Sequence, residues 1–485
     1  MTAPDGSRRV GIIGAGPGGI CMAIKLLDAG IDTFTIFERA PAVGGTWFQN
    51  TYPGCACDIQ SALYSFSFEV KRDWSRPYGT QPEIREYFEH CVAKYGLGPH
   101  IRLSTAIAAA HWDDERAVWR LVTEHGDEHE FDVVVGAVGM FNGLKWPDIP
   151  GLDDFAGTVF HSAAWDHEHD LAGARVAVIG TAASAVQFVP EIAREVGQLH
   201  VFQRTPNWVL PKEDVPYTPE QLERFRTDPD AILEERRTIF ERIDPLITFA
   251  DQTIVAASQE FAASNIALVE DPEVRAKLTP SFPHGCKRPL TSSDWYPTFN
   301  RPNVELVTET IERITSDGIV TDDGVCRAVD TIIMATGFET TRYLSAIDVT
   351  GRAGRSLRDD WHDGAHAYLG ITAAGFPNLF MLYGPNTNNG SILYMIEHQV
   401  DYTMRHLQWM RDDGLAWIDV RPEVMDAYNE DLDGALDAVE VWQVSCNNYY
   451  RGPNGRIVTQ WPHSMTEYET RTAVEDFDAY ETSRA

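Results

Sequence analysis

The sequence has no run of 18 consecutive apolar residues, and its first nine residues, MTAPDGSRR, contain no apolar segment. A membrane-spanning helix needs about 20 apolar residues, and a secretory signal needs an apolar stretch near its start. Neither feature is expected in this chain. We therefore predict a cytoplasmic protein that has no membrane partner.

Basic residues are scarce. The chain has 40 Lys and Arg against 72 Asp and Glu, which gives a formal net charge of −32 at pH 7. This charge repels nucleic acids and anionic lipid surfaces, so a nucleic-acid partner is not expected. A smaller phosphate ligand needs local basic side chains or a helix N-terminus in this negative field.

The sequence also lacks the cysteine spacings typical of disulfide frameworks and zinc sites, and it lacks the common metal-binding motifs. The chain has seven cysteines, an odd number, and Cys55 and Cys57 are the only close pair. Because no CxxC occurs, this pattern argues against a disulfide framework and against a zinc site. The sequence contains no HExxH, GxSxG or P-loop motif, so we expect no metal.

The strongest positive feature is a strand, glycine turn, helix and strand near the start. An apolar run at residues 9–13 leads into Gly14, Gly16 and Gly19, and the apolar run after the helix ends in Glu38. The three glycines permit a tight turn, close approach to a pyrophosphate and close helix packing. Glu38 can accept hydrogen bonds from a ribose diol. The unit predicts a dinucleotide site, which we assign to FAD.

The same unit recurs from residue 175. An apolar run leads into Gly180 and Thr181, a helix begins near Ser184, and Gln203 stands where the first unit has Glu38. An internal repeat of a whole supersecondary unit is more specific than one glycine motif. Two dinucleotide units in one chain indicate a flavoenzyme that uses two nucleotides.

The second unit has no acidic residue at the position of Glu38, and this difference predicts which nucleotide the second unit binds. A carboxylate would repel a 2′-phosphate, whereas Gln203, Arg204 and Thr205 can bind one. The second cofactor is therefore expected to be NADPH. One departure is Ala182, whose methyl group replaces the middle glycine and limits how closely a pyrophosphate can approach.

These units set the expected organisation. We predict an α/β fold with two Rossmann-like dinucleotide-binding domains. The FAD-binding domain comprises residues 1–146 and a second part at 341–485, and the NADP-binding domain comprises 147–340. The second domain carries a helical insertion at about 211–283, because that segment is charged and helical in pattern.

Two further motifs resemble those of type I Baeyer–Villiger monooxygenases, which are class B flavoprotein monooxygenases. Residues 155–166 match FxGxxxH(T/S)xxW(P/D), with Phe155, Gly157, His161 and Trp165 at the defined positions. The family's other signature matches Gly45, Thr46, Trp47 and Asp58. The resemblance covers nearly the whole chain. It implies that FAD, NADPH and molecular oxygen convert a ketone to an ester or lactone through a C4a-peroxyflavin.

The resemblance also assigns roles to residues. Arg288 resembles the active-site arginine, and Asp58 resembles the carboxylate that partners it. His161 and Trp165 are expected to order the linker between the domains. Tyr449 stands where many members have a Trp near the nicotinamide ribose. The expected cofactor-binding residues are Gly14, Gly16, Gly19, Glu38, Gly45, Thr46, Trp47, Asp58, Gly180, Thr181, Ser184, Arg204, Thr205, Lys287 and Tyr449.

The chemistry favours a ketone substrate over one alternative. A flavin peroxide must stay deprotonated to attack a carbonyl carbon, and the always-charged guanidinium of Arg288 can hold that negative charge. Asp58 can keep Arg288 in place. A flavin monooxygenase that oxygenates nitrogen or sulfur needs a protonated hydroperoxide and no such arginine, and it is the alternative function.

Two other classes explain less of the sequence. A disulfide reductase would need a CxxC or CxxxxC pair, and a non-enzymatic nucleotide-binding protein would leave Arg288 and Asp58 unexplained. The expected pocket segments, 54–60, 391–395 and 441–450, are mostly apolar or uncharged, which fits a small neutral ketone. No motif indicates which ketone it is, its selectivity or the oligomeric state.

The purified protein is expected to be yellow and to keep about one FAD per chain through gel filtration, because the first nucleotide unit is complete. The flavin absorbance of the protein peak measures this. A folded but colourless protein that takes up no added FAD would contradict the FAD site and the function built on it.

Overall fold

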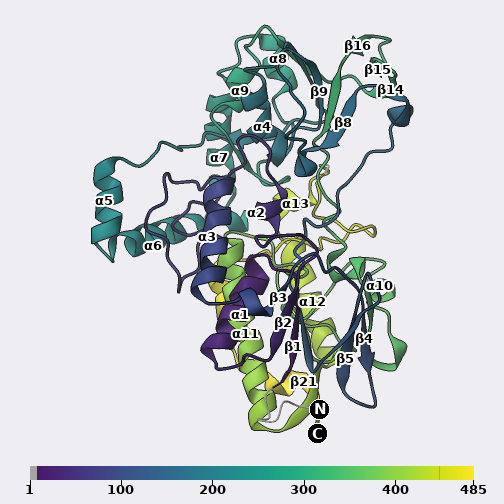
Figure 1. Cartoon of the computed structure of the whole chain (residues 1–485). Coiled ribbons are helices and arrows are strands. Elements are labelled where there is room, and N and C mark those ends of the chain that lie inside the picture. The colour runs from purple at the N-terminus through teal and green to yellow at the C-terminus, as the bar shows by residue number, and fades with distance from the viewer. Residues whose placement is uncertain (1–7, 447, 485) are drawn as a thin grey trace.

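Two parallel β-sheets with flanking helices form the two ends of the molecule in the computed structural model (Figure 1). The structure describes residues 8–446 and 448–484, so residues 1–7 of the N-terminal stretch considered above lie outside the described part. The middle of the chain forms one end, and the first and last parts together form the other.

The first sheet has the strand order β19-β7-β1-β2-β3 and is parallel throughout. Its central strand is apolar on both faces and fully buried, as expected for a parallel sheet covered by helices. In the register, Ile12 of β1 pairs with Ile36 of β2 and Val135 of β7. The strands are β1 (Val10–Ile13), β2 (Phe34–Phe37), β3 (Ile101–Arg102), β7 (Val133–Gly136) and β19 (Leu379–Met381).

The second sheet has the order β13-β10-β9-β17-β8 and is also parallel. Matched from the central strand outward, this order repeats that of the first sheet, with β9 in the place of β1. The repeat confirms the two Rossmann-like units expected from the sequence. The strands are β8 (Thr158–His161), β9 (Arg175–Ile179), β10 (Gln198–Phe202), β13 (Val304–Val307) and β17 (Thr331–Met334).

A helix follows the central strand of each sheet. Helix α1 (Pro17–Asp28) begins with proline at its first position, where no N–H partner is needed, and buries one apolar face. Helix α4 (Ala183–Ile192) occupies the same place in the second unit. The long helix α11 (Ile392–Asp412) packs against α1, although their first residues are 375 positions apart in the chain.

The remaining elements complete the two ends. A mixed sheet contains the antiparallel strands β4 (Ile107–Asp113), β5 (Val118–Thr123) and β6 (Glu128–Phe131), with β18 (Asp348–Thr350) parallel to β4. Two antiparallel sheets contain β14 (Ile311–Thr315), β15 (Gly318–Thr321) and β16 (Cys326–Ala328), and β20 (Leu415–Val420) with β21 (Tyr480–Arg484). Strands β11 (Val209–Leu210) and β12 (Leu290–Thr291) form a short parallel ribbon. The other helices are α2 (Thr46–Gln49), α3 (Gln81–Lys94), α9 (Trp295–Thr298), α10 (Leu357–Asp360), α12 (Pro422–Asp437), α13 (Glu440–Gln443) and α14 (Met465–Ala473).

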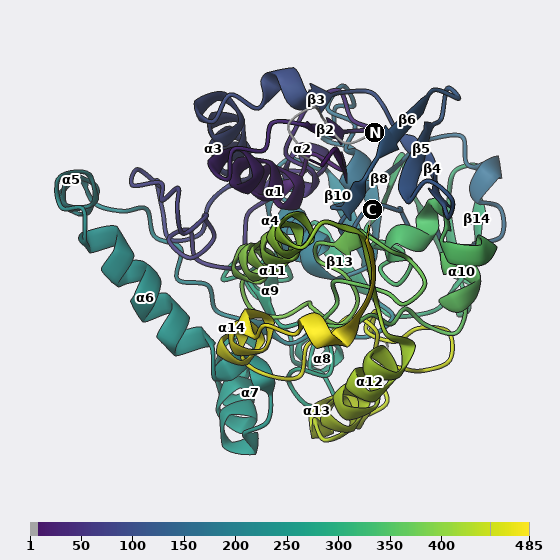
Figure 2. The same cartoon turned by 90° about the horizontal axis from the view of Figure 1, so that it is seen from below.

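The helical insertion projects to one side of the molecule through its first two helices, as the two views show (Figures 1 and 2). It consists of α5 (Pro219–Thr227), α6 (Ala231–Ile243), α7 (Gln252–Ile266) and α8 (Pro272–Lys277). In the described part of the chain, residues 8–446 and 448–484, no helix combines the length and the apolar character that crossing a membrane requires.

One half-buried arginine anchors the insertion to the loop at residues 62–65 of the first unit. Nη1 of Arg236, on α6, donates to the carbonyl oxygens of Ala62 (3.0 Å), Leu63 (3.2 Å) and Ser65 (2.8 Å). Ile232 and Ile239 of the same helix pack against Ala62 and Leu63. A charged donor that satisfies three carbonyls orders the loop as well as the helix.

Replacing Arg236 with Met should loosen this contact, because buried carbonyls lose their donor. Each such loss costs about 1–3 kcal/mol. Hydrogen exchange should therefore accelerate in residues 62–65 and α6. Arg237→Met is the matched control, since Arg237 is 67% exposed and makes only a surface ion pair with Glu241. Equal exchange in both variants would refute the anchoring role.

Candidate active site

The glycine turns of the two units have the same geometry. Gly14 and Gly180 have φ angles of 108° and 112°, a region that strongly favours glycine. A Cβ on Gly14 would lie 2.5 Å from the carbonyl oxygen of Ala137, and one on Gly180 would lie 2.3 Å from that of Ala335. Each turn therefore requires glycine because the chain passes against the neighbouring strand end.

The helix that follows each turn has an open N-terminus. Neither α1, which begins after Gly16, nor α4, which begins after Ala182, has a side chain that caps its first N–H groups. Unpaired N–H groups and the helix dipole together favour an anion at this position. Both turns thus fit the pyrophosphate of a dinucleotide.

One continuous cleft of about 1610 Å³ runs between the two units. Its lining brings together most of the residues singled out from the sequence: Gly14, Gly16, Glu38, Gly45, Thr46, Trp47, Asp58, Gly180, Thr181, Ser184, Arg204, Thr205, Lys287, Arg288 and Tyr449. Gly19 and the fingerprint residues Phe155, Gly157, His161 and Trp165 are not part of the lining. A Cβ on Gly19 would lie 2.0 Å from the carbonyl oxygen of Gly14, so Gly19 supports the turn from behind.

Glu38 is buried at the end of β2 and faces the cleft. Its Oε2 accepts a hydrogen bond from the N–H of Ala15 (2.7 Å), and its Oε1 accepts one from the N–H of Ala40 (2.8 Å). Each carboxylate oxygen has further acceptor capacity. The two bonds fix the carboxylate beside the glycine turn, where it can accept from a ribose.

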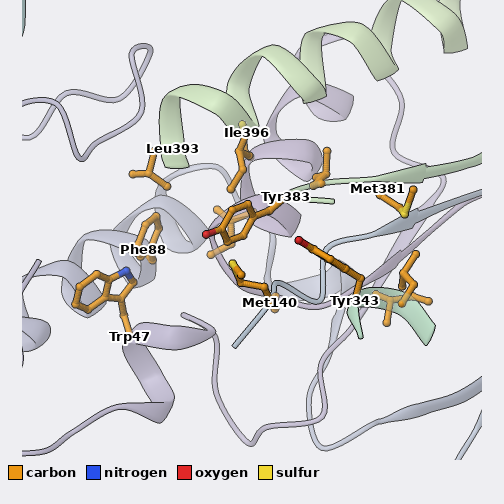
Figure 3. Close-up of a cluster of buried hydrophobic side chains, with 14 of the residues drawn as sticks. Trp47, Phe88, Met140, Tyr343, Met381, Tyr383, Leu393 and Ile396 are labelled. Atoms are coloured by element: carbon orange, nitrogen blue, oxygen red, sulfur yellow. The ribbon is translucent and has the colours of Figure 1, made fainter. Parts of the chain in front are cut away.

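Apolar and aromatic side chains form one wall of the cleft (Figure 3). The hydroxyl of Tyr383 donates to Oδ1 of Asn388 (2.7 Å), and Nε1 of Trp47 donates to the hydroxyl of Tyr64 (3.0 Å). These bonds fix the two rings. Of the labelled residues, Trp47, Met140, Tyr343, Tyr383, Leu393 and Ile396 line the cleft. Only Trp47 and the segment containing Leu393 were indicated by the sequence.

A second part of the cleft gathers positive charge. Nζ of Lys287 donates to the hydroxyl of Thr205 (2.5 Å) and to the carbonyl of Pro206 (3.3 Å). Burial, together with the nearby positive charge of Arg204, lowers the pKa of Lys287 to about 8. Two like charges held close together are stabilised by an anion. The side-chain amide of Gln203 is already hydrogen-bonded within the protein, because its Nε2 donates to the carbonyl oxygen of Lys277 (2.9 Å).

Asp58 lies where the two units meet and contacts two cations. Its Oδ2 is 3.7 Å from Nη2 of Arg288, and its Oδ1 is 3.5 Å from Nζ of Lys212. Oδ1 also accepts from the hydroxyl of Thr291 (3.3 Å) and from Nε2 of Gln187 (3.4 Å). Arg288 keeps 40% of its side-chain surface exposed, so its guanidinium can face a ligand in the cleft.

The short ribbon of β11 and β12 lies beside Asp58, because Thr291 of β12 donates to it. Leu210 pairs with Thr291. Lys212, which follows β11, and Arg288, which precedes β12, contact the carboxylate from beyond opposite ends of the ribbon. Lys212 also donates to the carbonyl of Cys57 (3.0 Å). The sequence analysis missed Lys212 because no local motif marks it, and its place depends on pairing across 80 residues.

The fingerprint residues lie along β8, the edge strand of the second sheet, and in the segments on either side of it. His161 ends β8 and is 1% exposed, with its ring 5.7 Å from that of Trp146 and 6.1 Å from that of Phe338. Burial lowers the pKa of His161 and so favours its neutral form. Trp165 packs against Phe188 of α4. A Cβ on Gly157 would lie 2.3 Å from the carbonyl oxygen of Asp330.

The cysteine prediction was wrong in one respect. Cys286 and Cys446 form a disulfide, with their Cα atoms 6.4 Å apart, although 160 residues separate them. Cysteine spacing could not reveal this pair because the fold alone brings the two segments together. Cys55 and Cys57, the only close pair in the sequence, are both free and buried. No cluster of three or more metal-ligating residues occurs within the described residues.

Comparisons with known proteins agree with this arrangement. A model of the family "Pyridine nucleotide-disulphide oxidoreductase" matches residues 11–244. A Baeyer–Villiger monooxygenase of Pseudomonas aeruginosa is 43% identical over 97% of this chain and 91% of its own, and one of Streptomyces coelicolor is 40% identical over 98% and 93%. The closed crystal structure of a cyclohexanone monooxygenase covers 100% of both chains, with a TM-score of 0.89 and 32% identity. With two nucleotide-binding units around one cleft, the chain belongs to the Baeyer–Villiger monooxygenase family.

Proposed function

We propose that this protein uses FAD, NADPH and molecular oxygen to convert a small neutral ketone to an ester or lactone. The observation that carries the proposal is the ion pair of Asp58 and Arg288, which lies between two dinucleotide sites. Oxygenation of nitrogen or sulfur would not require a fixed cation at this place. The proposal includes the domain bounds 1–146, 147–340 and 341–485 and a cytoplasmic location.

The residues of the first unit fit FAD. The open N-terminus of α1 suits the pyrophosphate, Glu38 can accept from the adenosine ribose, and the wall that contains Trp47 and Tyr383 can cover a flat ring. Gly45 has a φ of 56° and would meet Gly16 at 2.9 Å if it carried a Cβ. Both glycines therefore keep the approach to the pyrophosphate open.

The residues of the second unit fit NADPH. Lys287, Arg204 and Thr205 can contact a 2′-phosphate, and α4 offers its N-terminus to the pyrophosphate. Ala182, which replaces the middle glycine, is exposed at the mouth of the turn. Because Ala182 is exposed, its methyl group does not crowd the rest of the protein, and it restricts only the space left for the ligand.

The chain's own residues have a limited chemical role. When bound and reduced, FAD supplies the electrons and the oxygen-activating chemistry. Arg288 stays charged at any pH at which the protein is folded and stabilises negative charge that develops beside it. Asp58 positions Arg288, and Lys212 shares Asp58 with it. The apolar wall excludes water and suits an uncharged substrate.

The proposed role of Lys287 predicts a pH dependence. Because its pKa is lowered to about 8, Lys287 is a cation below about pH 7 and loses its charge towards pH 9. Only the cation attracts a 2′-phosphate, so the KM for NADPH should rise by about tenfold over this range, as expected for loss of a charge-assisted contact. The KM for NADH, which lacks the phosphate, is the control and should change little. Lys287→Met should flatten the NADPH profile, and a parallel rise for both cofactors would contradict the assignment.

The proposed role of Arg288 predicts that its replacement impairs ketone conversion while leaving FAD binding and NADPH oxidation in place. Arg288→Ala should still bind FAD and oxidise NADPH, but ketone conversion should fall by about a hundredfold to a thousandfold, because one preorganised donor to developing charge is lost. The reducing equivalents should appear as hydrogen peroxide. NADPH consumption, peroxide and product mass measured in one reaction test this balance.

Two variants calibrate that result. Asp58→Ala should fail in the same direction but less severely, because Asp58 acts through Arg288. Arg288→Lys keeps the charge without the planar fork and should recover part of the activity at most. Wild-type ketone conversion by Arg288→Ala would show that another residue carries the chemistry.

A further inference from the structure

The disulfide of Cys286 and Cys446 joins two distant parts of the chain that both contribute to the lining of the cleft. Cys286 lies in the turn that carries Lys287 and Arg288, within the proposed NADP-binding domain. Cys446 lies after α13, three residues before Tyr449, in the proposed second part of the FAD-binding domain. The bond therefore ties the segment that carries Arg288 to the segment that carries Tyr449.

We propose that Cys286 and Cys446 form a redox-modification site, in which hydrogen peroxide converts a dithiol to an interdomain disulfide that holds the cleft in one arrangement. A chain that buries so large a core does not need a disulfide for stability. In reducing compartments such bonds are mostly transient and redox-sensing. The location of the pair beside the cleft, rather than in a remote loop, supports this role.

The contacts around the pair hold the two segments in register before any bond forms. Nε1 of Trp442 donates to the carbonyl of Gly285 (3.1 Å), and Nδ2 of Asn448 donates to the carbonyl of Cys286 (2.9 Å). The ring of Trp442 also packs 6.0 Å from that of Phe249, in the insertion. The Cα separation of 6.4 Å lies in the ordinary range for a disulfide.

The burial of the two residues sets the order of the reaction. Cys286 has 0% of its surface exposed, whereas Cys446 is half-buried and can meet a small oxidant. The Cys446 thiolate attacks one oxygen of hydrogen peroxide and becomes a sulfenic acid, and hydroxide leaves. The Cys286 thiolate then attacks the Cys446 sulfur and expels a second hydroxide. With the two thiol protons, the products are one disulfide and two water molecules.

The oxidant is available from the activity itself. A flavin monooxygenase that consumes NADPH and oxygen without oxygenating a substrate releases hydrogen peroxide, and this pair lies beside the cleft in which that happens. A dithiol of the glutathione or thioredoxin type reverses the bond by thiol–disulfide exchange. The site therefore responds to the balance between leaked peroxide and the reducing pool.

The pair must be thermodynamically coupled to the nucleotide. Cys286 directly precedes Lys287, so a fixed Cys286 also fixes a proposed 2′-phosphate ligand. If the disulfide tightens NADP⁺ binding, NADP⁺ must stabilise the disulfide by the same factor. We expect a coupling of about fivefold to tenfold. Tenfold corresponds to about 30 mV in the midpoint of a two-electron couple.

The test uses the FAD-loaded full-length protein, first fully reduced and then treated with hydrogen peroxide. Alkylation under denaturing conditions followed by peptide mapping should show a link between the Cys286 and Cys446 peptides that dithiothreitol reverses. Five cysteines should stay alkylatable: Cys21, Cys55, Cys57, Cys91 and Cys326. Cys446→Ser should abolish the link, and Cys286→Ser should do the same while leaving a sulfenic acid at Cys446 that dimedone traps. Cys326→Ser is the control: it removes an exposed free cysteine outside the pair, and this variant should form the Cys286–Cys446 link normally.

The functional arm compares NADP⁺ affinity by calorimetry in the oxidised and reduced proteins, and the midpoint of the pair in thiol buffers with and without NADP⁺. Tighter binding after oxidation, a matching shift of the midpoint, and no effect of peroxide on Cys446→Ser support the proposal. Seven alkylatable cysteines after peroxide, or oxidation confined to Cys326, would overturn it. A reversible link that leaves NADP⁺ affinity unchanged would overturn the coupling. None of these measurements requires a ketone, so they are independent of the substrate assignment.

Discussion

The carboxylate of Asp58 is the point on which the two halves of the cleft depend. It belongs to a segment of the first unit, yet its partners Arg288, Lys212, Thr291 and Gln187 all come from the second. A half-buried carboxylate left without partners would be costly, so the position of the second unit is favoured by the charge of the first. The ion pair of Asp58 and Arg288 therefore serves two purposes: it holds the two units together, and it positions the cation that the proposed chemistry requires.

The sharing of Asp58 has a physical consequence for Arg288. Two cations at 3.5 and 3.7 Å divide the attraction of one negative charge, so neither is held as tightly as in a bidentate pair. The guanidinium keeps exposed surface toward the cleft. Its charge is thus positioned by Asp58 without being neutralised by it, as stabilisation of a second anion requires.

The sequence predicted those features that depend on local spacing. The two glycine turns, the helices behind them and the acid at the end of β2 follow from residue order within about 30 positions. The internal repeat likewise predicted the strand, turn, helix and strand that run from β9 to β10. Arg288 was indicated only by resemblance, since GCKR alone has no distinctive spacing.

The missed features depend on contacts between distant segments. Lys212 contacts Asp58 of the other unit, and Cys446 is bonded to Cys286 across 160 residues. Tyr343 and Tyr383 enter the cleft wall from the last third of the chain, where no periodic motif marks them. Residue type alone could not separate these side chains from ordinary core residues.

The strand β19 has a consequence for how the molecule is made. It pairs with β7 at the edge of the first sheet, although about 240 residues lie between them. The five strands of the second sheet, by contrast, all come from residues 158 to 334. During synthesis the second sheet can therefore close while the first is still one strand short, since domains fold as the chain emerges. The half of the molecule that leaves the ribosome first is the last to be completed, and until then the exposed edge of β7 has to be protected from pairing with other chains.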